Sequence, residues 1–271
     1  MRLLVTGGSG YLGSELLRRA AGRDDAVGTR LTAGGGGPRL DVRDASAVRR
    51  LIARVGADCV IHTAYVQSGP AMREVVVDGS RAVAAAAAEA GARLIHLSTD
   101  VVFGGERPGP WREADQPCPI TGYGRAKADA ERLVVDACPG ALVVRTSLLY
   151  GGVTRAPHEQ LVADAVAGCS DARFFTDELR CPIAVTDLAA ALLELAGRPE
   201  RGVMHLAGPE AISRYEFARL LAAAGGGDPD RVRPSRSADL PVARPRNCAL
   251  DSSRAHRLLR ARVRGPIEVL G

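Results

Sequence analysis

Lysine is almost absent from this chain of 271 residues, which has 36 lysine and arginine residues together but only one lysine, Lys127. Aromatic residues are also scarce, at 4% of the chain, so Ala, Val and Leu must supply most of a buried core. No charge-free apolar run approaches the roughly 20 residues of a membrane-spanning helix, so we expect no membrane association. The opening MRLLVTGG is too short an apolar run for a signal peptide, which predicts a cytoplasmic protein.

The six cysteines and five histidines form no pattern typical of a metal or redox site. There is no C-x-x-C, no H-x-x-x-H and no H-E-x-x-H, so we expect reduced thiols and no required metal. The net charge of +5 would suit a nucleic acid, but the arginines are spread over the whole chain and are not interleaved with aromatic residues. A solvated surface is the simpler interpretation, and we predict no nucleic-acid partner.

Short apolar segments alternate with helical patterns in the first half of the chain. The segments expected to form strands are residues 2–6, 26–31, 57–64, 93–99 and 141–150. Nearly continuous apolar strands alternating with helices predict a doubly wound parallel sheet of the Rossmann type, covered on both faces.

The alternation becomes irregular after about residue 150, where Pro- and Arg-rich loops separate short elements. We therefore expect a dinucleotide-binding domain over residues 1–150 and a small mixed α/β substrate-binding region over residues 151–271. Some segments of the second region are expected to return to the core sheet.

A glycine-rich loop follows the first expected strand. In VTGGSGYLG, the glycines Gly7, Gly10 and Gly13 form a G-x-x-G-x-x-G pattern that leads into a helix. Tyr11 and Leu12, at the start of that helix, are assigned to the cofactor site together with these glycines. Glycines allow a tight turn and let the backbone approach a pyrophosphate at the helix N-terminus. Between a strand and an amphipathic helix, this pattern predicts a dinucleotide site rather than a simple turn.

The end of the second expected strand favours NADP over NAD. An NAD site usually places an acidic residue there to bind the ribose 2′-hydroxyl, but this strand ends in GTRL, with Arg30. A guanidinium suits a 2′-phosphate by charge and by bidentate geometry, although Arg30 facing only water is the alternative. Asp41 and Val42, expected after a third strand, are predicted to lie near the adenine, and Ala64 is assigned to the same cofactor site.

The single lysine lies four residues after a tyrosine, in YGRAK. On a helix, this spacing places Tyr123 and Lys127 on the same face. A tyrosine that delivers a proton to a carbonyl oxygen needs a nearby cation, because its ordinary pKa is about 10. Arginine is a poor substitute for a compact ammonium group. We therefore predict carbonyl reduction by a nicotinamide, with Tyr123 as the proton donor and Lys127 both lowering its pKa and holding the cofactor ribose.

The glycine loop, Y-x-x-x-K and HLSTDVVFGG together resemble the extended short-chain dehydrogenases/reductases. Within them the chain is most similar to the dTDP-4-dehydrorhamnose reductase group, through S-T-D-x-V-F-x-G and GPWREADQPCPITGYGRAKADAE, over about residues 2 to 260. The resemblance implies an NADPH-dependent reductase of a 4-keto sugar nucleotide or another small-metabolite carbonyl. It also implies that Thr99 orients the carbonyl beside Tyr123, and that a homodimer is an expected assembly.

The resemblance departs from the group in the substrate loop. The group's D-Q-x-G-x-P-T resembles DELRCPI, in which Arg180 replaces a glycine and Ile183 a threonine. Asp177, Arg180 and Trp111 are the candidate substrate residues, and the substrate itself stays open. Two other functions also remain open: a non-catalytic NADP-binding regulatory subunit, as in methionine adenosyltransferase, and an epimerase or dehydratase with the same triad.

Overall fold

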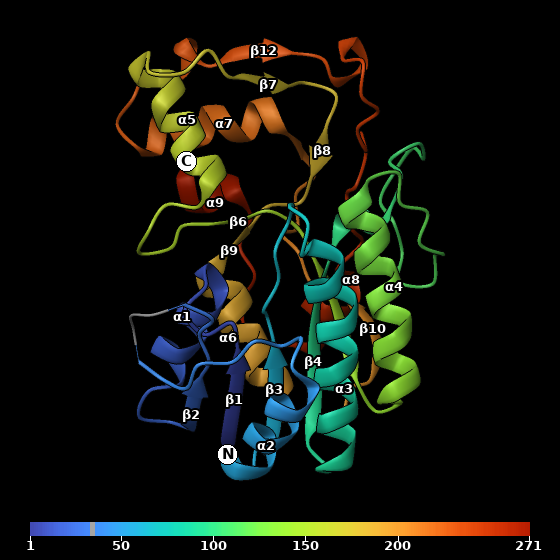
Figure 1. Ribbon diagram of the computed structural model, residues 1–271. Helices are drawn as coiled ribbons and strands as arrows, with labels where there is room; N and C mark the ends of the chain where they lie inside the picture. The colour runs from blue at the N-terminus through green and yellow to red at the C-terminus, as the bar shows by residue number, and fades with distance from the viewer. Residues whose placement is uncertain (33–35) are drawn as a thin grey trace. The chain divides into compact units, whose positions relative to one another are not determined.

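A six-stranded sheet forms the centre of the first part of the structure (Figure 1), with the strand order β10-β5-β4-β3-β1-β2. Its strands are β1 (Arg2–Thr6), β2 (Asp25–Gly28), β3 (Cys59–His62), β4 (Arg93–Thr99), β5 (Leu142–Thr146) and β10 (Gly202–His205). Strand β1 pairs in parallel with both β2 and β3, and β3 pairs in parallel with β4. This arrangement confirms the predicted Rossmann-type fold class.

The computed structural model describes residues 1–32 and 36–271. These form two compact units, each made of segments that are not contiguous in sequence. The first unit comprises residues 1–99, 122–145 and 189–204, and the second comprises residues 100–121, 146–188 and 205–271. The division of binding roles near residue 150 stays a prediction.

Helices complete the first unit. They are α1 (Tyr11–Ala20), α2 (Ala45–Val55), α3 (Gly79–Glu89), α4 (Gly122–Ala137) and most of α6 (Val185–Ala196), with a π-helical turn (Glu74–Asp78) before α3. The side chain of Asp44 caps α2 by accepting a hydrogen bond from the Ala47 amide, and Gly56 ends that helix in the left-handed conformation. The small alanines of α3 allow it to pack closely against α2 and α4.

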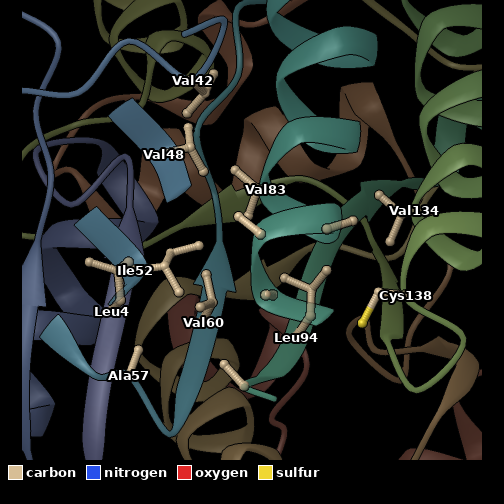
Figure 2. Packing of buried hydrophobic residues seen from close by; sticks show 14 of the residues in the cluster. Leu4, Val42, Val48, Ile52, Ala57, Val60, Val83, Leu94, Val134 and Cys138 are labelled. Carbon is tan, nitrogen blue, oxygen red and sulfur yellow. The ribbon is translucent and has the colours of Figure 1, made fainter. Parts of the chain in front are cut away.

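A hydrophobic core lies between the sheet and these helices (Figure 2). Leu4 of β1 and Val60 of β3 are fully buried, and Figure 2 shows Ile52 of α2 and Val83 of α3 among the residues of the same cluster. All four residues of β3 are buried, as expected of a central parallel strand.

The second unit is a mixture of short strands and helices. Its elements are β6 (Leu149–Tyr150), α5 (Pro157–Ala167), β7 (Arg173–Phe175), β8 (Leu179–Arg180), β9 (Ile183–Ala184), β11 (Ile212–Ser213), α7 (Arg214–Ala224), β12 (Arg233–Ser235), α8 (Ser253–Leu258) and α9 (Pro266–Leu270). Strand β11 is antiparallel to β8, whereas β12 is parallel to β7 and β6 is parallel to β9. These pairs form the mixed α/β region that the sequence predicts.

Two expected strands differ from the structure. Residues 141–150 form β5 and then β6, because β6 pairs with β9 instead of continuing along the main sheet. The strand expected before Asp41 and Val42 is only an isolated bridge between Arg30 and Arg39. Within the described residues, no helix is long and apolar enough to cross a membrane.

Gly13 is required by a close approach between α1 and the loop before it. A Cβ atom at this position would lie 2.1 Å from the carbonyl oxygen of Gly7 and 2.8 Å from the Cα of Gly8. We expect Gly13→Ala to lower the free energy of unfolding by about 1–3 kcal/mol, measured by urea denaturation. At Gly140 an added Cβ has no neighbour within 4 Å, so Gly140→Ala is the matched control. Equal stability of the two variants would contradict this account.

Candidate active site

The glycine loop lies against the segment that follows β3. Gly7 adopts a left-handed conformation, with φ of 76°, and accepts a hydrogen bond of 2.9 Å from the Gly10 amide. A Cβ on Gly7 would lie 2.8 Å from the backbone nitrogen of Ala64. The structure therefore brings the predicted cofactor residues Gly7, Gly10 and Ala64 together at the carboxyl ends of β1 and β3.

The N-terminus of α1 is open to an anion. Gly10 caps the helix without any side chain, and the first turn has no acidic residue. Within the described residues, the amides of Leu12 and Gly13 have no hydrogen-bond acceptor. Free amides at the positive end of a helix suit a phosphate group. Tyr11, also predicted here, is the first residue of the same helix.

Arg30 follows β2 and is held by its own loop. Its Nη1 donates a hydrogen bond of 2.6 Å to the carbonyl of Thr32, and its Nε donates one of 3.2 Å to the carbonyl of Gly37. Arg39 pairs with Arg30 through the isolated bridge, so two guanidinium groups lie on neighbouring segments. Sequence reasoning missed Arg39, whose only signal was its place after the run of glycines.

Asp41 and Val42 come directly after that bridge, and the two side chains differ in their burial. Asp41 forms an ion pair of 2.6 Å with Arg43, and the guanidinium lowers the pKa of this carboxyl. Val42 is buried, and its side chain lies so close to Gly79 that a Cβ there would come within 2.6 Å of it. A contact of either residue with adenine stays a prediction.

The three predicted catalytic residues all lie in the first unit. Thr99 is the last residue of β4, and Tyr123 and Lys127 lie in the first half of α4. Lys127 is only 5% exposed, and its Nζ donates a hydrogen bond of 2.7 Å to the carbonyl oxygen of Leu97. This bond joins the lysine to the strand that ends, two residues later, at Thr99.

Tyr65 is an aromatic neighbour of this site that sequence reasoning missed. Its ring centroid lies 6.0 Å from that of Tyr123, and Lys127 Nζ lies 5.7 Å from it. The side chain is 54% exposed. Its place directly after Ala64 was the only available signal.

A buried ion pair lies next to Lys127 in the structure. Glu131 lies one further helical turn along α4 and binds the Arg145 guanidinium of β5, with Nη2–Oε2 at 2.7 Å and Nε–Oε1 at 3.0 Å. Ser98 of β4 also donates a short hydrogen bond to Glu131. Burial lowers the pKa of Lys127 from 10.5 to about 8, and the charge of Glu131 opposes this shift.

The two core histidines near Lys127 are structural. His62 is fully hydrogen-bonded, with Nδ1 2.6 Å from Thr6 Oγ1 and Nε2 3.1 Å from Ser80 Oγ. Burial lowers the pKa of His62 to about 3 and also lowers that of His96, so both rings are neutral at pH 7. The hydrogen bonds and burial of His62 are those of a core residue.

Trp111, one of the three candidate substrate residues, packs against other residues of the second unit. It is buried and stacks on Phe103 with ring centroids 4.3 Å apart. Its Nε1 donates a hydrogen bond of 2.8 Å to the carbonyl of Asn247. The structure thus gives Trp111 a packing role, and contact with substrate stays a prediction.

Arg180 and Asp177 also hold loops of the second unit. The buried Arg180 guanidinium donates to the carbonyls of Pro245, at 2.8 Å, and Arg246, at 3.0 Å. The Asp177 carboxylate accepts a hydrogen bond of 2.7 Å from the Ser237 amide. Their role toward a substrate stays a prediction. Across residues 1–32 and 36–271, no group of three His, Cys, Asp or Glu residues could hold a metal ion.

Known proteins are similar to this chain over nearly its whole length. A family model described as RmlD substrate binding domain matches residues 1–265. A dTDP-4-dehydrorhamnose reductase of Mycobacterium tuberculosis is 37% identical over 258 residues, covering 91% of this chain and 83% of that protein. Methionine adenosyltransferase 2 subunit beta of Pongo abelii is 33% identical, covering 95% of this chain and 82% of that protein.

A solved structure shares the fold. The dTDP-4-dehydrorhamnose reductase of Bacillus anthracis, determined in complex with NADP, superposes with a TM-score of 0.88 at 24% identity. The match covers 99% of this chain and 96% of that one.

Because Lys127 is the only lysine, its titration can be observed directly. In protein labelled with carbon-13 at lysine Cε, we expect one resonance that titrates near pH 8 instead of 10.5. Glu131→Gln should lower this pKa further, because the opposing negative charge is lost. Glu89→Gln, at an exposed pair with Arg49, is the control and should leave it unchanged.

The same shift has a consequence for stability. Between pH 8 and 10.5 the unfolded chain binds more protons at Lys127 than the folded one, so stability should rise with pH there. The rise should approach about 3 kcal/mol and be absent from Lys127→Met, measured by urea denaturation across this range. An ordinary titration near 10.5 in the native protein would contradict the buried ammonium.

Proposed function

The chain belongs to the RmlD substrate binding domain family, and on that premise we propose that it is an NADPH-dependent reductase of a keto group on a sugar nucleotide. The observation that carries the proposal is the environment of Lys127. A chain that uses arginine elsewhere keeps its one lysine buried, four residues after Tyr123 and hydrogen-bonded to the strand that ends at Thr99.

The first unit fits a dinucleotide phosphate. The amides of Leu12 and Gly13 would hold the pyrophosphate, and the absence of a side chain at Gly10 leaves room for it. Arg30 and Arg39 supply two cations beyond β2, which suit a 2′-phosphate. When bound, NADPH supplies the hydride that reduces the carbonyl carbon.

Three side chains would handle the proton and the carbonyl oxygen. The Tyr123 hydroxyl donates its proton to the oxygen as negative charge develops there. Lys127, with its pKa near 8, is mostly protonated at pH 7, and its charge favours the tyrosinate that results. The Thr99 hydroxyl donates a hydrogen bond to the same oxygen and orients it. The carbonyl becomes a hydroxyl group.

Glu131 and Arg145 act on this chemistry only through Lys127. Their bidentate pair fixes α4 against β5, and the negative charge keeps the buried ammonium protonated near neutral pH. Without that charge, a larger share of Lys127 would be neutral at pH 7, and the tyrosinate would lose its stabilising cation.

A non-catalytic binding subunit is the second candidate. It is favoured by the 33% identity to the protein named methionine adenosyltransferase 2 subunit beta. The candidates differ in one observable, because only a reductase oxidises NADPH when a keto sugar nucleotide is added.

The reductase is tested by NADPH absorbance with a panel of keto sugar nucleotides and simple ketones. We expect Tyr123→Phe and Lys127→Arg to lower kcat by about 10²–10⁴-fold, because general acid catalysis is lost. Tyr215→Phe removes a hydroxyl from the second unit and should leave kcat unchanged. Binding of NADPH without turnover of any substrate would instead favour the binding subunit.

Cofactor choice is tested at Arg30. We expect Arg30→Ala to weaken NADPH binding by about 10–100-fold and to leave NADH binding nearly unchanged, because one charge-assisted phosphate contact is lost. Titration calorimetry with both cofactors measures this. The control is Arg49→Ala, which removes an exposed guanidinium paired with Glu89. Equal loss of both cofactors would mean that Arg30 only braces its loop.

A further inference from the structure

The charge of Arg214 is only partly balanced by its neighbours. It is the first residue of α7 in the second unit and is half-buried. Within the described residues, its guanidinium makes no hydrogen bond or ion pair; only its backbone amide is bonded, to the carbonyl of Glu178 at 2.9 Å. Charges withdrawn from water are normally paired, and a cation at the first turn of a helix also opposes the helix dipole. Within the described residues, the charges of Glu178 and Asp100 oppose the cost of burial, but neither carboxylate forms a hydrogen bond or an ion pair with Arg214.

Glu178 and Asp100, the two carboxylates whose charges act on Arg214, also bind other groups. Glu178 is fully buried, binds the Arg244 guanidinium and lies 3.6 Å from Arg180. Asp100 lies 3.7 Å from Arg180. Among the described residues of this cluster, three arginines therefore face two carboxylates, so the cluster carries one net positive charge.

Local pairing explains why Arg214 belongs to this cluster. Strand β11 is antiparallel to β8, with Ser213 opposite Leu179, so the next pair outward is Arg214 opposite Glu178. Side chains that face each other across an antiparallel pair lie on the same side. Arg214 is thus directed toward the charged cluster.

A second polar group near Arg214 also lacks a partner. The Nε2 atom of His158, on α5, is buried with no hydrogen bond in the described chain. Its ring centroid lies 5.8 Å from that of Phe217, which is one turn after Arg214 on the same face of α7. Figure 1 shows α5 and α7 side by side, and the two helices contact each other.

The electrostatics agree with this proximity. Burial and, to a smaller extent, the charge of Arg214 together lower the pKa of His158 to about 4. The imidazole is therefore neutral and can donate one N–H. Burial also lowers the pKa of Arg214, and the negative charges of Glu178 and Asp100 oppose this shift.

We propose that Arg214 and His158 form an anion site that binds the diphosphate group of a nucleoside diphosphate. The guanidinium fork matches phosphate oxygens, and the imidazole N–H supplies a further donor. An incoming anion would neutralise the excess charge and satisfy both unpartnered groups. Only the identity of the ligand rests on the proposed function; the anion site itself rests on the unpaired groups.

The test is titration calorimetry of the full chain with inorganic pyrophosphate and with dTDP, in the presence of NADP so that the glycine loop is occupied. Arg214→Gln should weaken both ligands by about 10–100-fold, and His158→Phe, which keeps the ring packing, should weaken them by about 3–10-fold. The matched control is Arg219→Gln, which removes a guanidinium from the same helix where it pairs with exposed Asp230. That control should stay within about twofold of the native protein.

Thermal unfolding without ligand supplies a second readout. Removing an unpaired charge should leave the Tm of Arg214→Gln equal to or above that of the native protein. A clearly lower Tm would give Arg214 a structural role and overturn the proposal. So would pyrophosphate affinity that is unchanged in Arg214→Gln.

The outcomes also separate this site from the reductase. Pyrophosphate binding that depends on Arg214, without turnover of any keto sugar nucleotide, would keep the anion site and reject the proposed reaction. Turnover of a keto sugar nucleotide, together with a dTDP affinity that is unchanged in Arg214→Gln, would keep the proposed reaction and reject the anion site.

Discussion

The hydrogen bond from Lys127 Nζ to the carbonyl of Leu97 is the contact on which the candidate site depends. It places a charged group between α4 and β4, where burial alone would favour the neutral amine. The carbonyl oxygen and the nearby carboxylate of Glu131 together compensate part of that cost. If α4 moved away from β4, Lys127 would lose its acceptor, and Tyr123 and Thr99 would no longer be fixed by the same pair of elements.

The buried pair of Glu131 and Arg145 extends this constraint to a third element. A buried ion pair contributes little net stability, because desolvation offsets most of the attraction. Its geometry is nevertheless demanding, since two parallel hydrogen bonds and a third from Ser98 must form together. We therefore regard it as a device that fixes the register of α4 against β4 and β5. It keeps the polar residues of the site on rigid secondary structure.

Much of the fold and site could be predicted because their signals are local. Alternating apolar strands and helices predicted the parallel sheet, and fixed spacings predicted the glycine loop and the Tyr123–Lys127 pair. The other features depend on residues distant in the chain: the pairing of β6 with β9, Tyr65 beside Tyr123, and the Arg214 guanidinium, which forms no ion pair within the described part of the chain. The spacing of residues within one segment cannot predict which carboxylates form ion pairs with arginines from distant parts of the chain.

The near-exclusive use of arginine has a consequence for the chemistry of the surface. Guanidinium groups do not lose their proton in the ordinary range of pH, so the positive charge persists into alkaline solution. The one side-chain amine of the sequence is that of Lys127, which is buried. An acylating reagent or a lysine-modifying enzyme would therefore find no exposed side-chain amine, and any acylation inside the fold would fall on the residue that the site can least afford to lose.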